Sequence, residues 1–87
     1  MKIKKGFILK EIAGNFVVVA VGPAVRDFNG AISLNGVGAT LWKALEKENT
    51  VDSLIWALLN EYQVEYEKAK TDVENFVNKL KEANLVE

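Results

Sequence analysis

The most constraining feature of the sequence is a junction between an expected strand and an expected helix in residues 31–42. In the run Ala-Ile-Ser-Leu, Ile32 and Leu34 would point to the same face of a strand. Asn35 comes next, and its side-chain oxygen can accept a backbone N–H in the first turn of a helix. The apolar residues that follow then recur at helical spacing: Val37, Leu41 and Leu45. The residues before this junction favour strands and those after it favour helices, so the junction predicts an α+β fold.

Three strands are expected before the helices. Their predicted ranges are Phe7–Ala13, Phe16–Val21 and Ala31–Leu34. Gly14-Asn15 predicts a type II′ turn between the first two. The second strand is expected to bend at Pro23 and to pair with the third across an Asn29-Gly30 turn. The basic residues Lys2–Lys5 are expected to be frayed and solvated.

Three helices are expected after the junction: Gly36–Glu48, a second helix opening at Thr50, and Glu65–Ala83. Thr50 is a good N-cap residue, whereas Glu65 is a poor one. Asn84 suits the left-handed residue after the last turn, and Leu85 would then fold back on Leu80 as in a Schellman motif. The prediction is a single domain over residues 1–87. Its fold is α+β and winged helix-turn-helix-like, a three-stranded antiparallel sheet followed by three helices that pack on one of its faces.

The composition argues against catalysis. The chain has 87 residues and contains neither cysteine nor histidine, so thiolate nucleophiles and the commonest general base and metal ligand are excluded. The segment around Gly36 and Gly38 lacks the lysine that a phosphate-binding loop requires. These two glycines are expected instead to allow close packing of the helix on the sheet. The acidic residues around Tyr62 and Tyr66 are interpreted as a solvated helix connection. We therefore expect no catalytic residue, no cofactor and no metal, and a protein that is not an enzyme.

The charge pattern also argues against nucleic-acid and membrane binding. The net charge is −1, and the expected third helix is acidic by one charge, so it presents no basic stripe for phosphates. Arg26 is the only arginine, which leaves that helix without bidentate guanine readout. The apolar run near the N-terminus ends at Lys10 and is too short for export or for a membrane span, so we expect a cytoplasmic protein.

Peptide binding is the function that these exclusions leave. A small sheet with an open edge offers N–H and C=O groups that an extended peptide can complete. Two alternatives stay open. A structural domain could dimerise through its sheet edge or through Trp56, which lies off the apolar stripe of its helix. A winged-helix regulator that binds DNA is the other alternative.

The ordered set of these residues resembles the PqqD-like family, the recognition elements that bind leader peptides of ribosomally made and modified natural products (RiPPs). The resemblance spans almost the whole chain. It rests on Leu34-Asn35 with Gly38 and Leu41-Trp42, on Leu54, Leu58 and Tyr62, and on Asp72-Val73, Phe76 and Leu80 with Leu85-Val86. The segment Pro23–Phe28 is longer than the corresponding link in PqqD proper, which argues against a role in pyrroloquinoline quinone synthesis itself.

The resemblance implies a winged-helix-like domain in which a leader peptide adds as a further strand beside the third strand, in the groove toward the third helix. Carried over to this chain, the peptide-binding residues would be Ala31, Ile32, Ser33, Leu34, Val73, Phe76, Val77 and Leu80. It also implies that the domain presents the precursor peptide to a modifying enzyme, often a radical SAM enzyme. No cofactor of its own is implied.

Overall fold

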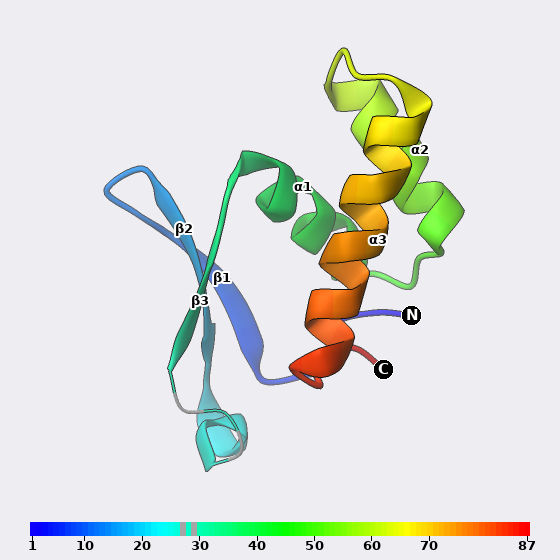
Figure 1. The fold of residues 1–87 in the computed structure, drawn as a ribbon. Helices are drawn as coiled ribbons and strands as arrows, with labels where there is room; N and C mark the ends of the chain where they lie inside the picture. Colours follow the sequence, from blue (N-terminus) through cyan, green and yellow to red (C-terminus); the bar gives the residue numbers. More distant parts are fainter. Residues whose placement is uncertain (27, 29) are drawn as a thin grey trace.

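The computed structural model describes residues 1–26, 28 and 30–87 and has the order β-β-β-α-α-α. The strands are β1 (Phe7–Ile12), β2 (Asn15–Ala20) and β3 (Ala31–Leu34), with a short 3-10 helix η1 (Gly22–Arg26) between β2 and β3. The helices are α1 (Gly36–Leu45), α2 (Val51–Glu61) and α3 (Tyr66–Glu82). Figure 1 shows the sheet on one side of the molecule and the three helices on the other. The predicted fold class is therefore confirmed.

The sheet is antiparallel throughout, in the order β1-β2-β3. Its register places Leu9 and Ile32 on either side of Val18, which is fully buried. The turn between β1 and β2 differs from the prediction, because its central residues are Ala13 and Gly14, both with positive φ (51° and 81°), as a type I′ turn requires. The expected Gly14-Asn15 turn would have set Glu11 opposite Val18. The observed register instead sets the apolar Leu9 opposite Val18.

The connection between β2 and β3 is not the bent strand that the sequence predicted. β2 ends at Ala20, and the residues around Pro23 form η1. Proline fixes its own φ and offers no N–H to a sheet ladder, so a tight helical turn suits it better than a strand. Beyond η1 the Phe28 ring meets Phe7 edge-on, with ring centroids 5.6 Å apart. The expected Asn29-Gly30 turn includes Asn29, which lies outside the described residues.

The N-terminal segment is packed against the domain, which corrects the expectation that Lys2–Lys5 are solvated and frayed. Ile3 is only 7% exposed, forms a bridge with Val86, and donates its N–H to Leu45 O at 2.9 Å. At Gly6 the chain turns with φ +97°, and a Cβ there would lie 2.6 Å from Ala24 Cβ. One apolar residue among lysines gave too weak a pattern to predict this anchoring.

The caps of α2 and α3 agree with the sequence predictions, whereas the end of α1 does not. Thr50 caps α2 through its side chain, and Glu65 precedes α3 without a side-chain cap. Asn84 has φ +60°, and Leu85 donates its N–H to Leu80 O at 2.9 Å, so α3 ends in the predicted Schellman motif. α1 ends three residues earlier than predicted, at Leu45.

One hydrophobic core joins the helices to the inner face of the sheet. Its fully buried large side chains are Trp42, Leu41, Leu45, Leu54, Ile55, Leu58, Leu80, Leu85, Val18 and Val73. The indole N–H of Trp42 is buried with no acceptor among the described residues. The outer face of the sheet stays open, with Ile8 38% and Ile12 56% exposed. Within the described residues, no helix has the length and apolar character needed to span a membrane.

Candidate functional site: a groove beside the third strand

A groove of about 230 Å³ lies between β3 and α3, with the first half of α1 at its base. It is lined by residues of β3, of the β3–α1 junction and of α3: Ser33, Leu34, Asn35, Val37, Gly38, Leu41, Asp72, Phe76 and Lys79. The groove is smaller than the roughly 300–1,000 Å³ usual for small-molecule sites. It therefore suits one or two side chains of a peptide better than a cofactor.

The strand beside the groove has an unpaired edge. β3 pairs with β2 along one side, and no second strand partner is found within the described residues. In an antiparallel ladder, alternate residues turn their N–H and C=O groups to opposite sides. Two of the four β3 residues therefore present both groups to the open side. An extended peptide can complete these hydrogen bonds, each with a net contribution of about 0.5–1.5 kcal/mol.

The junction after β3 sets the distance between the strand and the helices. Asn35 caps α1, since its Oδ1 accepts the Gly38 N–H at 2.8 Å. A Cβ at Gly38 would lie 3.3 Å from Leu34 Cβ, so only glycine lets α1 approach the end of β3 this closely without a shift. The prediction of close packing holds for Gly38. It does not hold for Gly36, where a Cβ would meet only the hydroxyl of Tyr62, the C-cap residue of α2, at 3.8 Å.

The helix side of the groove combines one aromatic side chain with two opposite charges. Asp72, Phe76 and Lys79 occupy positions i, i+4 and i+7 of α3 and so lie on one face. Phe76 is 8% exposed, and it contacts both the groove and the core. Both oxygens of Asp72 accept hydrogen bonds from Lys68 Nζ, at 2.8 and 2.9 Å. The groove thus has an apolar centre, an acidic end and a basic end.

The eight residues that the resemblance implied fall into two groups. Ser33, Leu34 and Phe76 line the groove, and Ala31 and Ile32 belong to the open strand beside it. Val73, Val77 and Leu80 are at most 3% exposed and belong to the core beneath α3. A peptide in the groove would not contact these three buried side chains without rearrangement.

Six groove residues were missed by the sequence prediction: Asn35, Val37, Gly38, Leu41, Asp72 and Lys79. The first four were assigned to the fold alone. Asp72 and Lys79 carried a usable signal, because they stand four residues before and three after Phe76. Helical spacing alone would have placed them on the groove side of α3.

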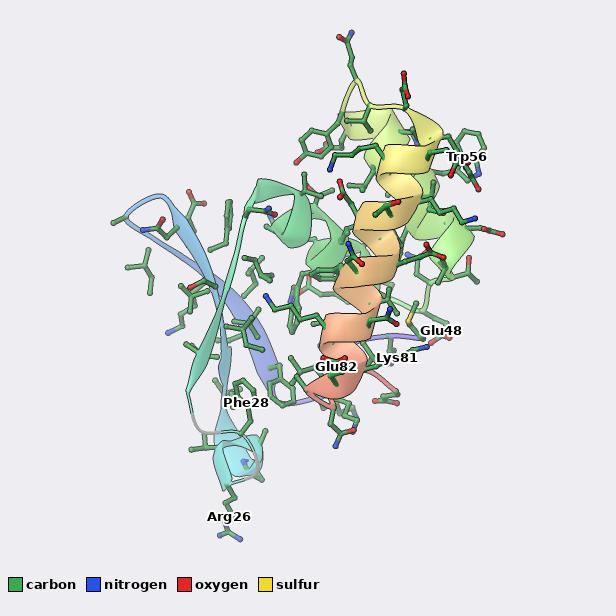
Figure 2. All side chains as sticks on the ribbon, viewed as in Figure 1. Arg26, Phe28, Glu48, Trp56, Lys81 and Glu82 are labelled. Carbon is green, nitrogen blue, oxygen red and sulfur yellow. The ribbon has the colours of Figure 1, made fainter. Side chains whose placement is uncertain are left out.

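Trp56 lies outside this site. It is 60% exposed, and Figure 2 shows it on the side of α2 turned away from the sheet. No group of three or more acidic side chains placed to hold a metal ion is found in the described part of the chain.

The fold and the groove define a class: a small winged-helix-like domain with an open strand edge beside an apolar helix face. Within that class, the sequence matches the family described as "Coenzyme PQQ synthesis protein D (PqqD)" over residues 15–86. This match covers most of the chain, and the chain belongs to the PqqD family. The resemblance inferred from the sequence is therefore confirmed. No curated protein matches the sequence.

Two solved structures share the fold. One is TbiB1 in complex with the TbiA(beta) leader peptide, with a TM-score of 0.77 and 23% identity, covering 100% of this chain and 95% of that chain. The other is a lasso peptide synthetase B1 complexed with the leader peptide, with a TM-score of 0.73 and 20% identity, covering 97% of this chain and 93% of that chain. Both neighbours are thus similar to this chain along almost its entire length, including β1, which lies before the start of the family match at residue 15.

Proposed function

We propose that this protein is a RiPP recognition element, a module that binds the leader of a ribosomally made precursor peptide and presents it to a modifying enzyme. The observation that carries the proposal is the groove between the unpaired edge of β3 and α3. Membership of the PqqD family supports it. Two structures with the same fold are complexes with leader peptides, which supports it further.

In this proposal the leader adds as a fourth strand beside Ala31–Leu34, and alternate side chains enter the groove toward Phe76. Main-chain pairing gives much of the affinity, and the groove gives specificity. A micromolar complex corresponds to about 8 kcal/mol, which one added strand with a few apolar anchors can supply.

The module would have no catalytic role of its own. A cytoplasmic enzyme of the radical SAM class would modify the core peptide while the domain holds the leader. Tethering raises the effective concentration of the core peptide near the enzyme to about the millimolar range for short linkers. Only moderate affinity for the leader is then needed.

The test is an NMR titration of the folded protein with the leader of a short peptide encoded beside its gene. The amide signals of Ala31–Leu34 and of the residues around Phe76 should shift. A set of leader peptides, each N-methylated at one backbone position, provides the control. Because a strand pairs through every second N–H, methylation should weaken binding with a period of two. Uniform sensitivity, or shifts confined to α2, would contradict the proposed groove.

A homodimer is the second candidate function, and the exposure of Trp56 favours it. Sedimentation velocity of the wild type and of Trp56→Ala separates the two. If Trp56 forms the interface, the wild type sediments as a dimer and the variant as a monomer. Under the leader-binding proposal, both bind the peptide equally well.

A further inference from the structure

The charges at the two ends of the groove make it directional. We infer that the groove selects peptides in which a basic residue precedes, and an acidic residue follows, the apolar side chain that contacts Phe76. This inference rests on the proposed function and adds a charge order to it. Asp72 would attract the basic residue and Lys79 the acidic one.

The spacing of the groove residues supports this assignment. Asp72 lies four residues before Phe76 and Lys79 three residues after it, which is about 6 Å and 4.5 Å along the helix at 1.5 Å per residue. In an extended peptide, side chains on one face repeat about every 6.6–6.8 Å. The charged residues of the peptide would therefore lie two positions before and two positions after the apolar one.

The direction of the peptide follows from the sheet. Both existing strand pairs are antiparallel, and antiparallel pairing is slightly more stable per residue than parallel pairing. Figure 1 shows β3 running upward toward the start of α1 and α3 running downward, in the opposite direction. A peptide antiparallel to β3 would thus run in the same direction as α3. Its N-terminal side meets Asp72 and its C-terminal side meets Lys79.

The chain offers a matched control on the other flank of α3. Glu74 and Lys81 have the same signs and the same seven-residue separation as Asp72 and Lys79, and they line a second hollow with Val51 and Val77. No residue of β3 lines this second hollow. Exchanging the charges there alters α3 in the same way without altering the groove.

The experiment selects peptides from a displayed library of random extended sequences against three proteins: wild type, Asp72→Lys/Lys79→Glu, and Glu74→Lys/Lys81→Glu. Wild type should enrich the basic-apolar-acidic order about tenfold over the reverse order, the size expected of two exposed ion pairs that change from attractive to repulsive. The groove exchange should reverse this preference, and the control exchange should leave it unchanged. Raising the salt to about 1 M should remove the preference while binding persists.

Three outcomes would overturn the inference. A preference for the reverse order in wild type means that the peptide runs the other way. If the selected peptides shift the amide signals of β3 but show no preferred order of charged residues, the inference is wrong and the proposed function stands. If no selected peptide shifts β3 or the residues around Phe76, the proposed function fails and this inference fails with it.

Discussion

In the described part of the chain, each of the two edge strands of the sheet has a strand partner on one side only, and the two strands differ in the charge of their side chains. β1 carries Lys10 and Glu11 side by side, both exposed, in its six residues. Charged side chains on an edge strand discourage the addition of another strand. β3 has no charged residue in Ala31–Leu34 and borders the groove. The comparison leads us to propose that side chains, and not the backbone, decide which edge of this sheet a peptide can join.

The largest effect is expected at the turn that holds β1 in place. Gly6→Ala should lower the free energy of unfolding by about 3 kcal/mol, because it combines a strained positive φ with an overpacked contact, each costing about 1–3 kcal/mol. The added Cβ would lie 2.6 Å from Ala24 Cβ. Urea denaturation measures the loss. Gly14→Ala is the control. The φ of Gly14 is also positive, at +81°, but an added Cβ would meet no neighbouring atom within 4 Å. This variant should therefore lower the free energy of unfolding by only about 1–2 kcal/mol. Equal losses in the two variants would mean that the contact with Ala24 has no effect.

A charge placed beside β3 should discourage strand addition at the β3 edge, as the charged side chains of β1 do at the other edge. Val37 is half-buried at the start of α1 and lines the groove. Val37→Asp should weaken leader binding at least about tenfold, since the carboxylate must lose water against an apolar side chain of the peptide. The helix dipole favours an acidic residue in the first turn, by about 0.3–1 kcal/mol, which limits the loss of stability.

The control for this change is Gly36→Asp, which puts the same charge one residue earlier. Gly36 is exposed and does not line the groove. Calorimetric titration with the leader should give near wild-type affinity for Gly36→Asp. Equal weakening by both variants would indicate a long-range charge effect and would argue against a peptide side chain in the groove.

Removing the charged side chains of β1 should allow another strand to pair with that edge of the sheet. Lys10→Thr/Glu11→Thr removes the two charges from β1 and leaves exposed residues that favour strands. We expect a weak, concentration-dependent dimer of about millimolar affinity in sedimentation equilibrium, with leader binding at β3 unchanged. Glu46→Thr/Lys47→Thr removes a similar exposed pair after α1 and should remain monomeric. If the β1 variant also stays monomeric, its charges are not what protects that edge.

Local signals in the sequence predicted most of the fold. Asn35, Thr50 and the Asn84-Leu85 ending act within a few residues, and the structure has each cap where the sequence placed it. Two of the failures involve contacts between separate segments of the chain. The anchoring of Ile3 depends on Leu45 and Val86, and the register of the first hairpin depends on placing Leu9 opposite Val18. Neither relation is visible in a local pattern.

The site was less predictable for a related reason. Periodicity separates the apolar face of α3 from its polar face, but it does not tell which apolar residues other helices cover. Val73 and Phe76 look alike in sequence, yet Val73 is fully buried and Phe76 reaches the groove. Asp72 and Lys79 enter the sequence prediction only through the net charge of the third helix, and Asp72 also through the family resemblance. Their place in the groove depends on β3 lying opposite them.

The smallest expected effect concerns the ion pair at the acidic end of the groove. Lys68 is bound to Asp72, and the two side chains are 65% and 28% exposed, so the pair should contribute only about 0.3–0.5 kcal/mol to folding. A basic residue of the peptide must compete with Lys68 for the same carboxylate. Lys68→Ala should therefore leave stability nearly unchanged and strengthen binding of a peptide with a basic residue at that position about twofold, by removing a competing cation of similar strength. Lys70→Ala, at an exposed position that does not line the groove, is the control. If Lys68→Ala weakens binding instead, Lys68 orients Asp72 for the peptide and does not compete with it.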